Sequence, residues 1–287
     1  MKELIENLYW NKLNKEELKD NFYNVVEKEY SAKELVETIL LIKNKQKILI
    51  NLPDSIDVCW TWWSWLDRLN TSTLTWLKLS KMWIKVAKHW NKASSWKFGS
   101  FDLLKSLNYS IPENKEDILL NYKKDNIVFL YANLLYPFLK ELSDLRKNYW
   151  KPTVFNILWP LLSPVNSKIH ISWCSFEDQM ELMIETFRLL WKDKVLVVRG
   201  EDWLDEVTLS TETNVFELNN GSIKNYSITP EQFWFERVPL ENILINDNEQ
   251  KVNISKNILS WIEKSPYNDL VDLNVDVINK ILLIKDN

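Results

Sequence analysis

The chain has 287 residues, of which 46% are hydrophobic and 26% charged, so it has enough apolar residues to build one large domain or two ordinary ones. Its 36 basic and 40 acidic residues give a formal net charge of −4, which offers no general attraction for nucleic acid or anionic membranes. No apolar run approaches the ~18 residues of a membrane span and the first residues carry no apolar signal core, so we expect a cytoplasmic protein.

Hydrophobic periodicity predicts a purely helical beginning and an alternation of strands and helices after it. Helices are expected over residues 2–9, 15–28, 31–44, 71–82, 100–106, 114–122 and 133–148. Strands are expected at 55–59, 84–87, 126–131 and 196–198, then a hairpin around 219–222 and amphipathic helices to the end. Alternation of this kind favours parallel crossovers, and therefore an α/β fold that carries a helical part.

Tryptophan and glycine occur in unusual numbers. The chain has 16 Trp and only 3 Gly, and the two together make up about 6.6% of it, near the ~7% glycine of an average protein. Trp83, Trp150 and Trp191 follow helical patterns, where a helix C-cap is normally glycine. Residues 57–65, with the sequence DVCWTWWSW, follow a β-branched run and precede a helical pattern, where phosphate-binding loops are normally rich in glycine.

We infer from these positions that most or all of the tryptophans are glycines under another codon table. Some bacterial lineages decode UGA as glycine, whereas a common alternative table decodes it as tryptophan. The other interpretation is a protein that is truly rich in tryptophan, although core or stacking residues would not favour turn positions. The coding DNA decides between the two.

With glycine at these positions, four ordered motifs resemble those of the anthranilate phosphoribosyltransferases. Residues 59–67 resemble the family's GTGGDGL loop, and Asn70-Thr71-Ser72-Thr73 resembles its NxST segment. Residues 86–100 resemble KHGNR followed by a serine-rich turn, residues 153–164 resemble TxFNxLGPLxNP, and residues 203–206 resemble GLDE.

The resemblance implies a fold of the nucleoside phosphorylase and anthranilate phosphoribosyltransferase type, with a helical N-terminal domain and an α/β domain whose central sheet is mainly parallel. We expect the helical part at residues 1–50, with a later contribution near 100–122, and the phosphoribosyltransferase domain at 51–287. The implied reaction transfers the phosphoribosyl group of 5-phosphoribosyl 1-diphosphate (PRPP) to the amine of anthranilate, with release of pyrophosphate, in tryptophan biosynthesis. Mg²⁺ is the implied cofactor and a homodimer the implied assembly, with no nucleic acid or membrane partner.

The same resemblance assigns the site residues. The PRPP-binding residues are Trp60, Trp63, Ser64, Arg68, Asn70, Thr71, Ser72, Thr73, Lys88, Trp96 and Ser100. The catalytic residues are Lys88, Asp205 and Glu206, and the metal ligands are Ser72, Asp205 and Glu206, which are hard oxygen donors suited to Mg²⁺. The anthranilate-binding residues are Asn91, Arg146, His89 and Pro160, with Arg146 suited to the carboxylate.

The sequence also departs from the family pattern at three positions. Ser64 replaces the acidic residue of the loop, Arg68 stands where a small residue is usual, and Tyr136 stands where the family often has histidine. Outside its motif His89 would be a hydrogen-bonded core or surface histidine, Arg146 a helix-surface cation and Asp205-Glu206 a solvated acidic pair. His170, Cys59 and Cys174 are expected to be structural.

Two other function classes remain open. A pyrimidine nucleoside phosphorylase would share the architecture and a related phosphate segment, but the Asp205-Glu206 pair and the NxST segment suit Mg²⁺-diphosphate better than free phosphate. A non-catalytic binding protein would use genuine exposed indoles to stack on sugars or bases.

Overall fold

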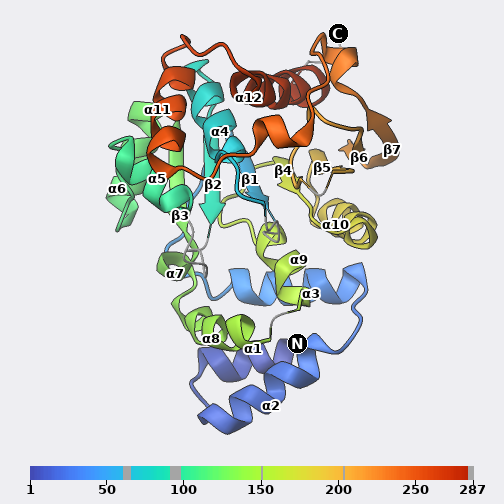
Figure 1. The fold of residues 1–287 in the computed structure, drawn as a ribbon. Helices are drawn as coiled ribbons and strands as arrows, with labels where there is room; N and C mark the ends of the chain where they lie inside the picture. Colours follow the sequence, from blue (N-terminus) through green and yellow to red (C-terminus); the bar gives the residue numbers. More distant parts are fainter. Residues whose placement is uncertain (61–65, 91–97, 150, 203, 284–287) are drawn as a thin grey trace.

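The chain begins with a layer of helices that lies below a central sheet (Figure 1). The computed structural model describes residues 1–60, 66–90, 98–149, 151–202 and 204–283. Helices α1 (Lys2–Tyr9), α2 (Lys15–Val26) and α3 (Ala32–Lys43) confirm the predicted helical beginning. Helices α2 and α3 each start at a capping box, in which Asn14 pairs with Glu17 and Ser31 with Glu34, so the N-cap amide and the amide three residues later both have side-chain acceptors.

A mixed sheet, with strand order β3-β2-β1-β4-β5-β6-β7, forms the centre of the molecule. Its strands are β1 (Ile56–Trp60), β2 (Val86–Trp90), β3 (Ile127–Tyr131), β4 (Ile169–Trp173), β5 (Lys194–Gly200), β6 (Thr213–Asn219) and β7 (Ser222–Ile228). All pairs from β3 to β5 are parallel, whereas β6 and β7 add an antiparallel hairpin at one edge. The predicted α/β class with a mainly parallel sheet and a helical N-terminal part is confirmed.

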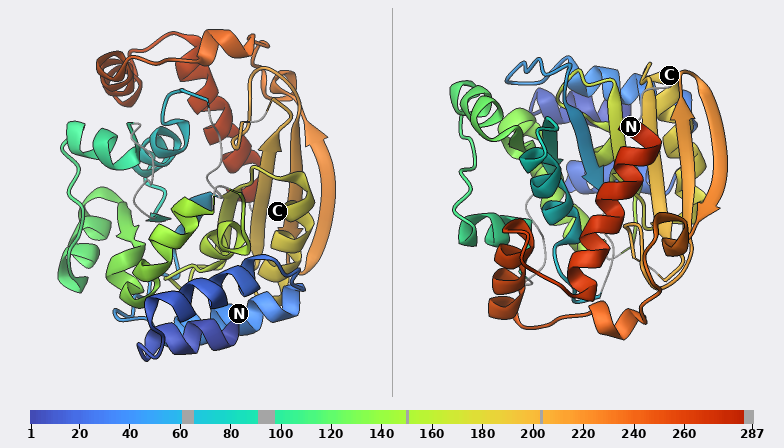
Figure 2. Two further views of the ribbon diagram at one scale, coloured as in Figure 1. Left: turned by 60° about the horizontal axis from the view of Figure 1, so that its bottom comes forward. Right: turned by 90° about the horizontal axis from the view of Figure 1, so that it is seen from above.

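Helices cover both faces of this sheet, as the two further views show (Figure 2). One apolar cluster joins a face of the sheet to α3, α9 (Val154–Leu161) and α10 (Glu177–Leu189). A second cluster joins the other face to α4 (Thr71–Lys81) and α12 (Pro266–Val277). Side chains alternate between the clusters along each strand, so Val58 belongs to the second cluster and Asp57 points the other way.

The remaining helices extend the two layers. They are α5 (Ser100–Ser106), α6 (Lys115–Asp125), α7 (Ala132–Leu135), α8 (Leu142–Asn148) and α11 (Asn248–Leu259), with the short helices η1 (Pro137–Glu141), η2 (Pro230–Phe233), η3 (Leu240–Ile243) and η4 (Ile278–Leu283). The single helix predicted over 133–148 is wrong. It is divided into α7, η1 and α8 because Pro137 has no amide hydrogen and its ring clashes with the preceding turn. Helix α8 contacts α2, and α6 contacts β3.

Four tryptophans have a left-handed backbone. Trp83, Trp191, Trp234 and Trp261 have φ between 58° and 69°, each beside the end of a helix. Their side chains are 83%, 81%, 91% and 56% exposed. Every other non-glycine residue described with a positive φ is an asparagine, a residue whose short polar side chain tolerates this region.

Three other tryptophans have a buried indole N–H group for which the described residues offer no acceptor. They are Trp76, Trp159 and Trp173. A buried indole usually has a hydrogen-bond partner, so these three indole N–H groups are unsatisfied.

Among the described helices, none combines the length and apolar character required to cross a membrane.

Candidate active site

The predicted site residues follow or end the parallel strands, whose carboxyl ends meet at one edge of the sheet. Lys88 and His89 lie near the end of β2, and Asp205 and Glu206 follow β5. Ligands of open α/β sheets bind outside this edge. The fold therefore brings segments that are distant in sequence to the edge where such a site forms.

Asp205 and Glu206 form a buried acidic pair on a turn that is stabilised by hydrogen bonds to Asp202. Asp202 accepts hydrogen bonds from the amide of Leu204 and from the hydroxyls of Thr208 and Ser210. A Cβ on Gly200 would lie 2.6 Å from Oδ1 of Asp202, so the tight approach requires glycine there.

Each carboxylate of the acidic pair contacts a donor from another segment. Two guanidinium nitrogens of Arg68, Nε and one terminal nitrogen, donate to the two oxygens of Glu206, each at 2.9 Å. The Arg68 guanidinium also lies 3.8 Å from Asp205, which accepts a hydrogen bond from Ser175 at 3.0 Å. Burial raises the pKa of Asp205 to about 6, and the charge of Glu206 adds to this shift while Arg68 opposes it.

The start of α4 has the features of an anion site. Asn70 is its N-cap residue, but the Asn70 side chain does not cap the helix, and its buried Oδ1 has no donor within the described part of the chain. The hydroxyl of Thr73 donates to Ser100 at 3.0 Å, which joins two residues predicted to bind phosphate, and Ser72 is half-buried in the same turn. Free amides at a helix N-terminus attract phosphate.

Lys88 is completely buried in β2, opposite Val58 of β1. Burial lowers the pKa of its ammonium group to about 7, while the nearby Cys59 and Glu206 favour the charged form. The influence of Glu206 places Lys88 in the electrostatic field of the acidic pair. Since its pKa is close to neutral, a bound anion would bring this lysine fully into its charged form.

His89, on the opposite face of β2 from Lys88, belongs to a buried group centred on Asp57. One Asp57 oxygen lies 2.7 Å from Nδ1 of His89 and the other lies 3.2 Å from Nδ1 of His170. Because β1 lies between β2 and β4, the alternation of side chains brings all three residues to the same face. Sequence reasoning did not identify Asp57, although it lies just before the predicted loop.

The two histidines carry different charges. Nε2 of His89 lies 3.0 Å from the carbonyl oxygen of Trp159, so both ring nitrogens face oxygen acceptors and must both donate. The pKa of His89 is raised well above its usual value, because attraction to Asp57 outweighs burial. His170 has no partner for Nε2 in the described structure, and burial lowers its pKa to about 4. His89 is therefore an imidazolium, and His170 is neutral.

Three residues expected to bind anthranilate gather around Trp159. The guanidinium of Arg146 lies 5.5 Å from the centre of the Trp159 ring, His89 contacts the Trp159 carbonyl, and Pro160 is the next residue in α9. Burial lowers the pKa of Arg146 to about 10, so it remains charged at neutral pH. Two cations thus lie near one apolar segment.

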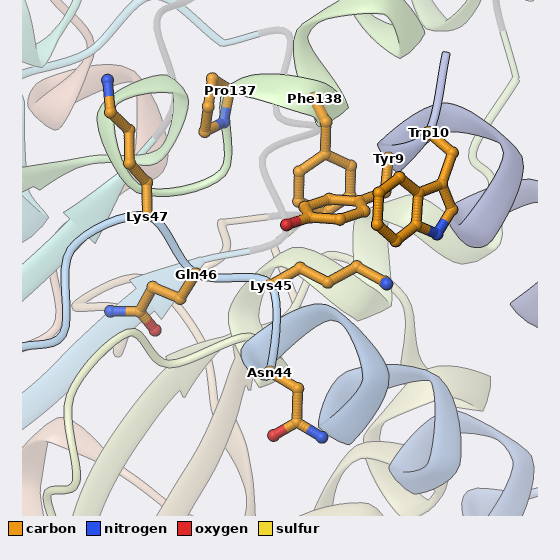
Figure 3. Close-up of a pocket in the computed structure, with 8 residues that line it drawn as sticks. All are labelled: Tyr9, Trp10, Asn44, Lys45, Gln46, Lys47, Pro137 and Phe138. Atoms are coloured by element: carbon orange, nitrogen blue, oxygen red, sulfur yellow. The ribbon is translucent and has the colours of Figure 1, made fainter. Parts of the chain in front are cut away.

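Several predicted residues lie outside the described part of the chain, and Trp60 is described only as the last residue of β1. Those outside are Trp63, Ser64, Asn91 and Trp96. A hollow near the N-terminus, between α1, η1 and the segment after α3, is a separate feature (Figure 3). Its central cation, Lys45, lies 4.1 Å from the ring centre of Tyr9 and pairs with Glu6 at 3.1 Å. None of the predicted site residues lines this hollow.

The fold is that of a known class of transferase. Residues 53–281 match the family model described as glycosyl transferase family, a/b domain. The structure of anthranilate phosphoribosyltransferase from Thermus thermophilus superposes with a TM-score of 0.88 at 24% identity, covering 99% of this chain and 85% of the other. The yeast enzyme in complex with PRPP and Mg gives 0.79 at 20% identity, covering 97% and 80%.

Sequence relatives narrow the class. The anthranilate phosphoribosyltransferase of Bacillus cereus strain B4264 is 34% identical over 247 residues, which cover 85% of this chain and 72% of the relative. That of Geobacillus sp. strain WCH70 is 32% identical over 244 residues, with the same coverage of both chains. The chain belongs to the anthranilate phosphoribosyltransferase family of glycosyltransferases.

Proposed function

We propose that the chain transfers the phosphoribosyl group of PRPP to the amine of anthranilate and releases pyrophosphate. The observation that carries the proposal is the combination of a buried acidic pair, an uncapped helix N-terminus and a buried lysine at one sheet edge. These groups match a metal-bound diphosphate, which needs carboxylates for the metal and positive donors for the phosphates. The relatives named for this reaction, and the yeast complex with PRPP and Mg, support the same assignment.

The donor set fits Mg²⁺. Asp205, Glu206 and Ser72 offer hard oxygens. Burial raises the pKa of Asp205, so a cation beside it would favour its charged form. Among the described residues, no group of three or more His, Cys, Asp or Glu side chains could hold a metal ion alone. Mg²⁺ commonly uses one or two carboxylates and completes its shell with phosphate oxygens and water, so this pair fits a metal that arrives with PRPP.

The residues then have distinct roles. Mg²⁺ bound there would stabilise the negative charge that develops on the departing diphosphate. The α4 amides, Asn70, Thr73 and Ser100 orient the phosphates, and Lys88 adds a positive charge. Arg146 binds the anthranilate carboxylate, while His89 and Pro160 line the anthranilate channel and Asn91 adds a polar contact. The sheet edge thereby holds the aromatic amine near the ribose carbon.

We also propose that glycine stands at most or all of the 16 tryptophan positions in the working enzyme. The left-handed φ of Trp83, Trp191, Trp234 and Trp261 supports this, because glycine adopts that region without strain. The buried and unsatisfied indole N–H groups of Trp76, Trp159 and Trp173 support it independently. We call the chain with glycine at all 16 positions the glycine chain, and sequencing of the coding DNA tests the proposal: UGG codons at these sites would refute it.

The activity is tested by incubating the glycine chain with PRPP, Mg²⁺ and anthranilate and following the loss of anthranilate fluorescence. We expect loss that requires all three components and is abolished by EDTA. Orthophosphate with thymidine or uridine is the contrasting assay. Phosphorolysis of these nucleosides, without consumption of anthranilate, would assign the chain to the nucleoside phosphorylases instead.

For the assembly, we propose a cytoplasmic homodimer formed through the N-terminal helices. Leu40 of α3 and Leu49 are 51% and 72% exposed, which leaves apolar surface on this layer for a second copy. Sedimentation equilibrium should give twice the chain mass of 34.4 kDa. A single species at the monomer mass, at the concentrations used for activity, would exclude the dimer.

A further inference from the structure

Arg68 occupies the acidic pair that the proposed function assigns to a metal. Its two guanidinium donors lie 2.9 Å from the two oxygens of Glu206, in the parallel geometry that arginine forms with carboxylates. The Arg68 side chain is 16% exposed, and those of Asp205 and Glu206 are 4% exposed. The contact joins residues 138 positions apart, so the tertiary fold creates it.

The backbone around Arg68 is held in place by another segment. Arg68 forms an antiparallel bridge with Leu244, and the carbonyl of Asp67 accepts a hydrogen bond from Ile245 at 3.0 Å. The carboxylate of Asp67 also lies 3.5 Å from the ammonium of Lys251. The backbone of Arg68 is therefore fixed, and only the conformation of its side chain decides whether the guanidinium contacts the acidic pair.

The charges explain what this contact does. Two buried carboxylates would repel each other, and one guanidinium halves their net negative charge. It also takes both oxygens of Glu206, so a divalent cation that binds Glu206 meets a positive group at contact distance. The same carboxylate cannot serve both cations fully, because they repel each other at low dielectric.

We propose that Arg68 is a built-in counter-ion that competes with the divalent cation for Glu206. It halves the negative charge of the acidic pair in the metal-free protein and lowers the affinity of the pair for free metal. When metal binds with the diphosphate of PRPP, the displaced guanidinium has phosphate oxygens to pair with, which suits its forked donors. Metal binding is then coupled to PRPP binding. Only this last step rests on the proposed function.

The test measures Mn²⁺ binding by electron paramagnetic resonance, first without PRPP, and the glycine chain is the parent for all variants. For Arg68→Gln we expect a dissociation constant at least tenfold lower than that of the parent, with Arg68→Lys between them because lysine offers one point charge. Arg188→Gln is the matched control: Arg188 forms a similar pair with Glu185, at 2.8 and 2.5 Å, but on the exposed surface of α10. It should bind Mn²⁺ as the parent does.

Dissociation constants within threefold of the parent for both Arg68 variants overturn the proposal. If Arg68→Gln unfolds in EDTA and Mn²⁺ restores its circular dichroism, the restoration supports the competition. If it stays unfolded, Arg68→Lys decides by the same threefold limit. Adding PRPP should lower the Mn²⁺ dissociation constant more in the parent than in the folded Arg68 variants. A parent that makes no product from anthranilate but shows the Arg68-dependent shift would refute the proposed function and leave the competition standing.

Discussion

At the residue scale, four tryptophans and four asparagines share one backbone conformation. Asparagine tolerates a positive φ, whereas a bulky side chain there is strained by about 1–3 kcal/mol. The strained indoles are also exposed, so they gain little burial in return. Sequence position alone predicted this for Trp83 and Trp191, because both follow helical patterns at the place where a C-cap glycine is usual.

Replacing these four tryptophans by glycine should therefore stabilise the chain. We expect the variant with glycine at Trp83, Trp191, Trp234 and Trp261 to gain about 1 kcal/mol per position, because relief of strain exceeds the entropy that glycine adds to the unfolded state. Urea unfolding measures the gain. Trp10→Gly is the control: Trp10 is 61% exposed but its φ is −92°, so glycine there should not stabilise. Equal effects at Trp10 and at the four sites would contradict the argument.

Lys88 predicts a pH dependence of PRPP binding. Its pKa of about 7 in the free chain means that Lys88 is charged below pH 7 and becomes neutral as the pH rises. Binding of phosphate to the charged form should weaken above pH 7, by up to about tenfold per pH unit. Lys88→Arg keeps its charge at every accessible pH, so its KM for PRPP should vary less above pH 7. A parallel pH profile for both chains would show that Lys88 does not carry this charge.

At the element scale, the strands that could be predicted are those with continuous β-branched or apolar runs. The runs at β1, β3 and β5 were placed within two residues of their observed starts, and the β6–β7 hairpin followed from Asn219-Asn220-Gly221-Ser222. Strand β4, with the sequence IHISW, was missed because His170 and Ser172 interrupt its apolar run. Both are buried in the sheet, where only the tertiary fold supplies Asp57 as a partner for His170.

The strand group of Asp57, His89 and His170 predicts how stability depends on pH. The pKa of His170 is about 4 in the folded chain and about 6.5 in the unfolded chain. Between these pH values the unfolded chain binds a proton at this histidine, whereas the folded chain does not. Between pH 7 and pH 5 this should remove about 2 kcal/mol of stability. His89, with a raised pKa, contributes stability that is present below pH 6.5 and lost only at higher pH, and Asp57, whose pKa is lowered well below its usual value, does not titrate in this range.

The substitution His170→Gln isolates the effect, because an amide can still donate to Asp57 but does not titrate. Its free energy of unfolding should fall less than that of the parent between pH 7 and pH 5, by about 2 kcal/mol. Urea unfolding at the two pH values gives both numbers. The same acid loss in parent and variant would mean that His170 accepts a proton in the folded state.

At the scale of the whole molecule, the order of the motifs could be predicted from the sequence, but the contacts between them could not. The motifs place Lys88, Asn70 and the acidic pair on consecutive parts of an α/β chain, and parallel topology brings them to one edge. The pairing of Arg68 with Glu206, and of Asp57 with both histidines, could not be predicted, because these partners lie more than 30 residues apart and side-chain geometry decides between them.

The last prediction compares two whole chains, the printed sequence and the glycine chain. An indole in a phosphate-binding loop fills the space of the diphosphate and prevents close approach of backbone amides, so the predicted loop at 60–65 should bind PRPP poorly with tryptophan and well with glycine. Isothermal titration calorimetry with PRPP and Mg²⁺ should detect tight binding only to the glycine chain. Restoring glycine at Trp60, Trp62, Trp63 and Trp65 alone should recover most of the affinity, whereas restoring the four left-handed positions alone should recover stability without affinity. Equally tight binding by both whole chains would show that the tryptophans belong to the enzyme.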